Sequence, residues 1–453
     1  MKTYMKRHLR KLTTIGVAVL AVNACDVDTA LDVQDPDIIN PVDVQSPAGA
    51  DAVRTGALAR FTAATTDDES LFLLGGLFAD EWINGDSFIA RQEIDQRVVT
   101  SENTFLTAAN RNLHRARLSA EQAIELLNQY NPSAPGWHLG EMYFIQAYVI
   151  NILAEHYCDG LIFSRVEGGR EEYGSPITTA AAFARALALA DSGLAVVTGT
   201  TANDTRVRNA LLVTKGRIQL NLNQPAAAAT TVTNVPTSYN YPIFHSATVT
   251  NSIWDFNNNA RRYSVSAGEG TNGLNFATAG DPRVPVCVGN DTACRAINVT
   301  TNRRDDQLTP VHVQMLWTAR ENSVNIIRGV DARMIQAEAA LRANNAPGAL
   351  LILNDARLTV TGLAPLTLQA TPEAQRAQLF RERAFWQFSR GYRVGDMRRL
   401  ITQYQVPAAS VFPVGLWHKG GNYGGDVNFP VPQAEMNNPN LSGVEQTCIN
   451  RNP

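Results

Sequence analysis

Long segments with helical periodicity constrain the fold of this chain more than any other feature. The segment 103–130 places apolar residues on one side of a helix, because positions three and four apart share a face; these are Leu113, Ala116, Ala120, Ala123 and Leu127. Similar segments are residues 50–62, 137–157, 178–197, 206–221 and 225–233. Alanine-rich helices of this length joined by short turns indicate stacked helix–turn–helix pairs. We therefore predict a mostly α fold of TPR-like stacked helix pairs, without a strict repeat period.

Helical pattern returns from residue 326 and culminates in the charged, aromatic-rich stretch 371–400. Thr371 can cap free backbone amides, Pro372 suits the first helical position, and Gly391 predicts the helix end. One apolar stripe consists of Ala377, Phe380, Ala384 and Phe388. We interpret the many charges of this stretch as pairs at the rim of a core helix, and an anion site is the alternative.

The middle of the chain, residues 235–325, is rich in Asn, Thr, Gly, Pro and aromatic residues and shows little helical period. A long irregular stretch in a compact protein is usually functional or builds a small subdomain. Within it, residues 251–256 indicate a short strand. The predicted organisation is a signal peptide (1–24), a lipidated Cys with an acidic tether (25–50), an N-terminal TPR-like helical region (51–234), a loop-rich ligand-binding subdomain (235–325) and a C-terminal helical region with its tail (326–453).

The first 24 residues predict a lipoprotein signal peptide that is removed before folding. Basic residues precede an apolar run over residues 12–24 that is too short to span a membrane as a mature helix. Cys25 follows Ala24 directly, as in a bacterial lipobox, so we predict that Cys25 is lipidated and anchors the protein. Ordinary signal cleavage before an incidental cysteine is the alternative. The acidic residues that follow, Asp26, Asp28, Asp32, Asp35 and Asp37, predict an extended tether.

Export permits disulfides among the other cysteines. Cys287 and Cys294 flank a turn-rich loop and are predicted to pair. Zinc is the less favoured reading, because the spacing differs from paired CxxC ligands and no histidine lies close. Cys158 and Cys448 could form a second disulfide, which the sequence does not decide. The net charge of −3 argues against a general nucleic-acid binder.

Catalytic and metal motifs are missing from the sequence: it contains no HExxH, GxSxG, Walker A or EF-hand pattern. Residues 268–273 fit GxGxxG but lack the strand and helix that a phosphate site needs, so we interpret them as a flexible loop. Adjacent acids such as Asp80–Glu81 and Asp305–Asp306 leave an exported hydrolase open, since glycosidases use two carboxylates across a cleft. We predict a protein that is not an enzyme and has no cofactor and no metal.

Binding of a ligand without catalysis is the class of function that remains. Aromatic rings stack on apolar sugar faces, and Asp, Asn and Arg side chains bond to hydroxyl groups. The predicted ligand-binding residues are loop aromatics and their polar neighbours: Asp80, Trp82, Asn84, Asp86, Trp254, Arg262, Tyr263 and Trp317, accompanied by Arg261 and Arg320. A packed loop anchor is the alternative for each tryptophan.

Several of these segments, in order, resemble the SusD/RagB family of outer-membrane nutrient-binding lipoproteins. The late helix of that family is matched by Glu382, Arg383, Gly391, Arg393, Asp396 and Arg399, whereas Trp386 and Arg390 depart from it. An earlier helix is matched by Arg328, Ala337, Glu338 and Ala339. The family ending is matched by Pro430, Pro432, Glu435, Asn438, Pro439 and Leu441.

The resemblance implies a surface-exposed protein, lipid-anchored in the outer membrane and facing the extracellular side. It implies capture of an oligosaccharide, or in some members a peptide, and delivery to a SusC-like TonB-dependent transporter, without bond cleavage. The early and middle loops would form the glycan platform. An exported glycan-active hydrolase and a peptide-binding member are the alternatives to an oligosaccharide binder, and a surface scaffold without a small ligand is a further one.

Overall fold

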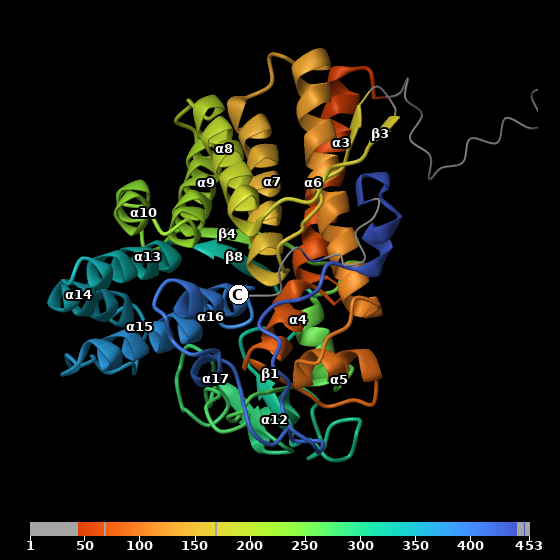
Figure 1. Cartoon of the computed structure of the whole chain (residues 1–453). Coiled ribbons are helices and arrows are strands. Elements are labelled where there is room, and N and C mark those ends of the chain that lie inside the picture. Colours follow the sequence, from red (N-terminus) through yellow and green to blue (C-terminus); the bar gives the residue numbers. More distant parts are fainter. Residues whose placement is uncertain (1–43, 68, 168–169, 442–447, 449–453) are drawn as a thin grey trace, which may run out of the picture.

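Antiparallel helices standing side by side form the upper part of the molecule (Figure 1). The computed structural model describes residues 44–67, 69–167, 170–441 and 448, so the predicted signal peptide, Cys25 and most of the tether lie outside the described residues. The helices of this part are α3 (Pro47–Thr66), α6 (Thr104–Tyr130), α7 (Gly136–His156), α8 (Thr179–Val196), α9 (Ala202–Asn221) and α10 (Pro225–Thr231). Helix α3 packs on α6, α6 on α7, and α7 on α8 and α9. The predicted mostly α fold of stacked helix pairs is confirmed.

Polar caps explain where these helices begin. The side chains of Asn103, Thr178 and Thr201 each accept a backbone N–H in the first turn of α6, α8 and α9, which satisfies donors that the helix itself leaves free. Asp204 completes a capping box with Thr201. By length and composition, α8 is the one helix among the described residues that could cross a membrane; here it packs against α7 and α9.

A second group of helices flanks this array: α13 (Gly329–Arg342), α14 (Ala346–Arg357), α15 (Pro372–Trp386), α16 (Arg393–Thr402) and α17 (Ala408–Val411). Helix α13 packs on α10 and α9 on one side and on α14 and α15 on the other, which extends the array to the left in Figure 1. Thr371 caps α15 by accepting the N–H of Ala374 at 3.2 Å, as the sequence predicts.

Helix α15 ends at Trp386, earlier than the sequence predicts. Ser389 and Gly391 have left-handed backbone, with φ of 54° and 70°. Long-range contacts hold this turn: the Ser389 N–H donates to Glu81 Oε1 at 2.9 Å, and the Ser389 hydroxyl accepts from Trp82 Nε1 at 3.1 Å. A side chain on Gly391 would meet Phe72 and Ile152 at 2.9 Å, so glycine serves a close approach as well as the turn.

Irregular loops form the lower part of Figure 1, and the short strands are spread over the molecule. The strands form antiparallel pairs: β1 (Trp82–Asn84) with β5 (Tyr263–Val265), β2 (Arg165–Glu167) with β3 (Arg170–Glu172), β4 (Asn240–Ile243) with β8 (Val324–Arg328), and β6 (Val286–Val288) with β7 (His312–Gln314). The short helices are α4 (Leu71–Phe78), α5 (Ile89–Gln96), α11 (Ser252–Trp254), α12 (Thr292–Ala296), the π-helix η1 (Asp255–Asn259), and the 3-10 helices η2 (Gln433–Asn437) and η3 (Pro439–Leu441).

The strand predicted over residues 251–256 is wrong, because this segment forms α11 and the first turn of η1. Asn251 starts the helix: its side-chain oxygen accepts the N–H groups of Ile253 at 3.0 Å and Trp254 at 3.2 Å. An asparagine that bonds to the backbone two and three residues ahead favours a helical turn over an extended chain. The helix predicted from residue 326 also starts later, because β8 occupies residues 324–328.

The largest hydrophobic core joins the helical array to the loops. Phe61 contacts Phe144 and Tyr148 edge-on, with ring centroids 5.8 and 5.4 Å apart. Trp82 and Phe388 belong to the same cluster, so the core continues from the helices to strand β1. A separate small cluster around Cys287, Cys294 and Val313 supports the loop-rich end.

Candidate functional site

Many of the predicted ligand-binding residues are buried and hold the loops together. Asp80 and Trp82 are fully buried. The Asp80 carboxylate accepts two hydrogen bonds from Arg393, both at 2.7 Å, and Trp82 Nε1 donates to Ser389 at 3.1 Å. These side chains contact the core instead of a ligand, which corrects the prediction. The alternative reading of Trp82, a packed loop anchor, describes its place in the structure.

Asn84 and Asp86 are buried in the same way and organise the turn after β1. The side-chain oxygen Oδ1 of Asn84 accepts the N–H of Asp86 at 3.0 Å, and Asp86 accepts the N–H of Phe88 at 2.9 Å while pairing with Arg91. Both side chains are fully buried, so the prediction that they contact a ligand is corrected as well.

Tyr263 and Trp317 also point inward. The Tyr263 hydroxyl donates to Glu69 at 2.9 Å, and Trp317 Nε1 donates to the carbonyl of Ser323 at 3.2 Å. The guanidinium of Arg390 lies 5.0 Å from the centre of the Trp317 ring. Burial explains both corrections, since neither ring offers a face to solvent.

Trp254 differs from these residues, because it lines an open polar cavity at the loop-rich end. This cavity has a volume of about 570 Å³. Its lining combines one indole with amides, hydroxyls and one guanidinium: Trp254, Asn258, Asn259, Arg261, Asn298, Thr300, Thr301 and Thr318, with Ala296, Ile297 and Val299. Half-buried Trp254 and polar side chains around it are the combination expected at a sugar site. We call this space the Trp254 cavity.

Unusual backbone surrounds the Trp254 cavity. The π-helix η1 supplies Asn258 and Asn259. Arg261 and Asn298 have φ of 54° and 64°, a left-handed region that non-glycine residues rarely adopt. Short π-helices and strained residues occur frequently at functional sites. The backbone conformation and the lining side chains therefore both indicate a functional site at the Trp254 cavity.

Cations gather on one side of the cavity. Arg261 and Arg262 both pair with Asp305, at 3.2 and 3.5 Å. Arg320 is exposed, and its guanidinium lies 6.0 Å from the centre of the Trp254 ring. Arg262 also lies 5.2 Å from the ring of Phe88, which is 49% exposed. Arg262 is thus half-buried beside the exposed ring of Phe88, and its contact with a ligand stays a prediction.

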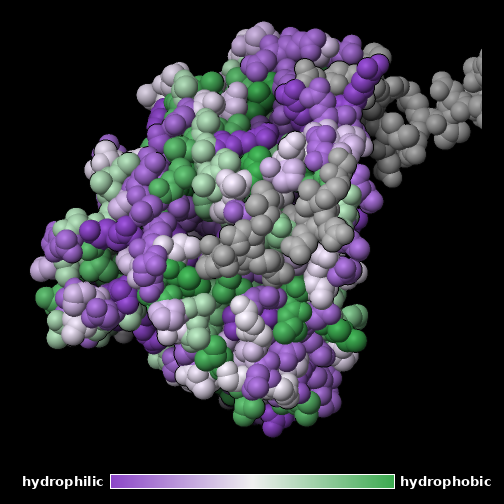
Figure 2. Space-filling model, viewed as in Figure 1, coloured by the Kyte–Doolittle hydropathy of each residue, from purple (hydrophilic) through white to green (hydrophobic). Residues whose placement is uncertain are grey.

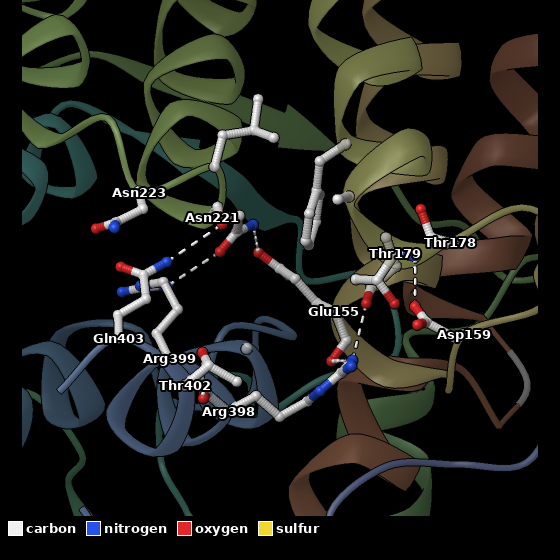
Figure 3. Close-up of a pocket in the computed structure, with 15 residues that line it drawn as sticks. Glu155, Asp159, Thr178, Thr179, Asn221, Asn223, Arg398, Arg399, Thr402 and Gln403 are labelled. Atoms are coloured by element: carbon white, nitrogen blue, oxygen red, sulfur yellow. Dashed lines mark hydrogen bonds between the residues drawn. The ribbon is translucent and has the colours of Figure 1, made fainter. Parts of the chain in front are cut away.

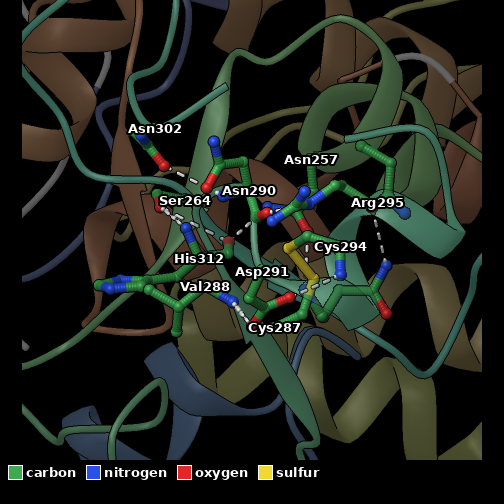
Figure 4. Close-up of a disulfide and its surroundings, with 12 residues drawn as sticks. Asn257, Ser264, Cys287, Val288, Asn290, Asp291, Cys294, Arg295, Asn302 and His312 are labelled. Atoms are coloured by element: carbon green, nitrogen blue, oxygen red, sulfur yellow. Dashed lines mark hydrogen bonds between the residues drawn. A yellow bond between two sulfur atoms is a disulfide. The ribbon is translucent and has the colours of Figure 1, made fainter. Parts of the chain in front are cut away.

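A disulfide fixes one wall of the cavity (Figure 4). Cys287 and Cys294, the pair expected from the sequence, are bonded with an S–S distance of 2.03 Å. Asp291 caps α12 by accepting the N–H of Cys294 at 2.7 Å, and the wall residues 296–301 follow directly. Asp291 lies close to both sulfurs, but zinc binds thiolates and a disulfide provides none. The second bridge, Cys158–Cys448, is present with an S–S distance of 2.05 Å.

A second cavity of about 410 Å³ lies where α7, α8, α9 and α16 meet (Figure 3). Its polar groups mainly bond to one another. Asp159 accepts the N–H of Thr179 at 2.5 Å, and Arg398 donates to the backbone carbonyls of Ala154, Glu155 and Tyr157. These contacts join helices, so this cavity is a weaker candidate than the Trp254 cavity.

Among the residues that the structure describes, the pairs Asp80–Glu81 and Asp305–Asp306 provide no cleft with two free acids. Burial raises the pKa of Glu81 to about 8, yet Glu81 and Asp80 are buried and do not line the Trp254 cavity. Burial opposes ionisation of Asp306 as well, but hydrogen bonds from Lys419 and Thr309 outweigh it and lower its pKa to about 2. Asp305 is paired with two arginines. The arrangement therefore favours binding over acid–base chemistry.

Sequence reasoning missed the amides and hydroxyls of the cavity and the exposed ring of Phe88. The missed lining residues are Asn258, Asn259, Asn298, Thr300, Thr301 and Thr318. A signal was present: three consecutive asparagines, residues 257–259, follow Trp254 closely. Side-chain amides concentrated beside an aromatic residue in a loop could have pointed to this segment.

No protein family model matches the chain, and no curated protein matches it by sequence. Solved structures do match over most of its length. A SusD-like protein from Bacteroides fragilis shares 12% identity, covering 88% of this chain and 96% of its own, with a TM-score of 0.63. A SusD superfamily protein from Parabacteroides distasonis shares 14% identity, covering 87% of this chain and 98% of its own, with a TM-score of 0.63.

A SusD-like carbohydrate binding protein from Bacteroides vulgatus shares 11% identity, covering 78% of this chain and 83% of its own, with a TM-score of 0.56. At such identities the agreement concerns the fold. It extends over most of the chain, since each match covers more than three quarters of it. The resemblance predicted from the sequence is confirmed at this level, and the chain has the fold of SusD superfamily proteins.

Proposed function

We propose that this protein binds an oligosaccharide in the Trp254 cavity and delivers it to a partner TonB-dependent transporter of the outer membrane. The observation that carries the proposal is the cavity itself: an indole, amides, hydroxyls and a guanidinium line one open space on a SusD-like fold. One protein of similar fold is described as carbohydrate binding, which supports the same class of ligand.

The chemistry of the lining suits a sugar chain. A sugar ring would stack on Trp254, since aromatic faces bury apolar C–H groups well. Exposed Asn259, Asn298 and Thr300 would bond to its hydroxyl groups. Phe88, beyond Arg262, offers a second ring on which a longer chain would continue. An oligomer is therefore a better fit than a single sugar.

The protein would bind its ligand without cleaving it. The acids near the cavity are engaged by arginine, lysine or amide groups: Asp305 by Arg261 and Arg262, Asp306 by Lys419 at 2.8 Å, and Asp255 by the amide of Asn259 at 2.7 Å. A general acid needs a free carboxyl of raised pKa beside the scissile bond. The proposal therefore assigns no catalytic residue.

Anchoring and partner follow from the sequence. Cys25, behind an apolar signal segment, would carry the lipid, and the acidic segment 26–43 would hold the folded part away from the bilayer on the extracellular side. A TonB-dependent barrel is the expected partner for hand-over. Affinity purification of the tagged full chain from its own membranes tests this: a co-purifying barrel of stoichiometric amount is expected, and its repeated lack would contradict the proposed partner.

A binding experiment tests the ligand class. The chain starting at Asp26 is applied to glycan and peptide arrays, and the best oligosaccharide is titrated by calorimetry. We expect binding without product release, and Trp254→Ala to weaken it by at least about tenfold, as truncation of a central aromatic anchor usually does. Phe244→Ala is the matched control, because Phe244 is an aromatic residue that is 73% exposed and lies outside the cavity. Binding of peptides alone, or equal loss in both variants, would contradict the proposal.

A further inference from the structure

We propose that the Trp254 cavity selects anionic oligosaccharides, whose sugars carry carboxylate or sulfate groups, over neutral ones. This inference rests on the proposed function and names its substrate class.

The residues that line the cavity include a single charged side chain, Arg261, and no carboxylate. The Arg261 side chain is 44% exposed, so its guanidinium can reach a ligand. A cation without a neighbouring acid in the lining attracts anions, and low-dielectric walls strengthen the attraction. A neutral sugar would use this group only as a hydrogen-bond donor.

Cations outnumber acids in the layer behind the lining. Asp305 is shared by Arg261 and Arg262, and Arg262 also lies 3.9 Å from Asp86, a carboxylate that Arg91 already pairs with. Arg304 is fully buried nearby and donates to the backbone carbonyls of Asn257 at 2.5 Å and His312 at 2.8 Å. Backbone carbonyls do not neutralise its charge, so the positive charge of Arg304 remains behind the cavity.

Arg320 adds a further cation near the Trp254 ring. The acid Asp306 is already matched by Lys419 at 2.8 Å. Asp255 belongs to η1 but is not part of the lining, and its charged carboxylate accepts a hydrogen bond from the amide of Asn259. Arg261, Arg262, Arg304 and Arg320 thus face the acids Asp305 and Asp255, so the balance around the cavity is positive, in a chain whose net charge is −3.

The amide of Asn258 points to the same ligand chemistry. Asn258 lines the cavity and is only 7% exposed. Its oxygen accepts from Gln314 at 3.5 Å, whereas its NH2 group has no hydrogen-bond partner among the described residues. An NH2 group can only donate, and carboxylate or sulfate oxygens can only accept. The nitrogen itself is buried behind the lining, so a small side-chain rotation would bring this donor to a carboxylate or sulfate oxygen in the cavity that Arg261 also lines.

Backbone strain is retained at the charged residue. Arg261 has φ of 54° directly after η1, where glycine or asparagine would be the less strained choice. Strain of this kind persists where the residue has a task that a relaxed one would not perform. At this position we expect that task to be the presentation of the Arg261 guanidinium to the ligand.

A ligand panel tests the selection in the wild-type chain starting at Asp26. Three oligosaccharides of equal length are titrated by calorimetry: a neutral cello-oligosaccharide, an oligogalacturonate for carboxylates and a carrageenan oligosaccharide for sulfates. We expect at least one anionic ligand to bind about tenfold or more tightly than the neutral one at low salt, since a charge-assisted hydrogen bond contributes at least that much. We expect this preference to shrink as salt is added.

Matched variants locate the effect. Arg261→Gln should weaken anionic binding about tenfold and neutral binding by a smaller factor, because a neutral sugar loses only a hydrogen-bond donor. Arg261→Lys should retain most of the preference. Asp305→Asn should strengthen anionic binding, because Arg261 and Arg262 lose their shared counter-ion. Arg60→Gln, an exposed site on α3 with the same change in charge, should have no effect.

Three results would overturn the selection. Equal affinity for neutral and anionic glycans would refute it and leave the proposed function intact, and an anionic preference that survives Arg261→Gln would place it elsewhere. Binding of acidic peptides with no glycan bound would overturn the proposed function as well. Circular dichroism of each variant, with unchanged spectra and melting, keeps loss of binding separate from loss of fold.

Discussion

Replacing Asp80 by asparagine separates a structural role from a ligand-binding role. The Asp80 carboxylate is fully buried, accepts two hydrogen bonds of 2.7 Å from Arg393, and accepts the N–H of Leu274 at 3.0 Å. Asparagine keeps the shape but loses the charge and one acceptor, so Arg393 is left buried without its counter-ion. Breaking a buried pair in this way typically costs about 3–5 kcal/mol, a large part of an ordinary free energy of unfolding of about 5–15 kcal/mol.

The measurement is urea unfolding at pH 6 followed by circular dichroism, with disulfides intact. In the wild type, burial raises the pKa of the neighbouring Glu81 to about 8, and the charge of Asp80 adds to this rise. The double variant Asp80→Leu with Arg393→Met removes both charges and should recover part of the loss. Trp254→Ala, by contrast, should change stability little. A loss below about 1 kcal/mol in Asp80→Asn, or lost ligand binding at unchanged stability, would refute the structural assignment.

Two further predictions concern buried groups. Burial in the folded chain raises the pKa of Glu81 from 4.5 to about 8, so the native state retains a proton that the unfolded chain releases. The free energy of unfolding should therefore fall as pH rises through this window. In thermal melts from pH 5 to 9, Glu81→Gln should remove that part of the pH dependence. A Glu81→Gln profile parallel to that of the wild type would contradict the shift. Gly391→Ala should lower the free energy of unfolding by more than about 1 kcal/mol, because φ is 70° and the new Cβ meets Phe72 and Ile152 at 2.9 Å. Gly56→Ala in α3 has open space around it and should be neutral or stabilising. Similar denaturation midpoints for the two variants would count against this prediction.

Local signals explain why the helical array could be predicted. Thr371, Asn103 and Thr178 each bond to backbone amides within three residues, so the information lies in a few consecutive letters. The end of α15 was missed for the opposite reason. Ser389 is held by Glu81 and Trp82, which are far away in the sequence, and tertiary contacts of that kind leave no local pattern.

The same difference explains the errors at the site. Trp82 and Trp254 both sit among Asp and Asn residues in loop-like stretches, so their local sequences look alike. Trp82 is buried because Phe388 and Ser389 pack against it, whereas Trp254 follows an asparagine cap at the rim of a cavity. Residue type and neighbours indicate what a side chain could do, and only the fold decides which side chains face solvent. Figure 2 shows polar and hydrophobic residues mixed over the visible surface, so hydropathy alone does not mark the site either.

The buried residues nevertheless serve the cavity, because they position the chain that forms it. Strand β1 pairs with β5, with Asn84 opposite Tyr263, and the N–H of Gly85 donates to the carbonyl of Arg262 at 2.7 Å. A side chain at Gly85 would meet the Arg304 side chain at 2.5 Å, so the turn after β1 lies directly against the cationic layer. Loss of the Asp86–Arg91 pair should therefore weaken ligand binding indirectly, by releasing the backbone of Arg262. Such a change would lower the affinity for neutral and anionic oligosaccharides by similar factors, whereas Arg261→Gln should lower the affinity for anionic oligosaccharides more.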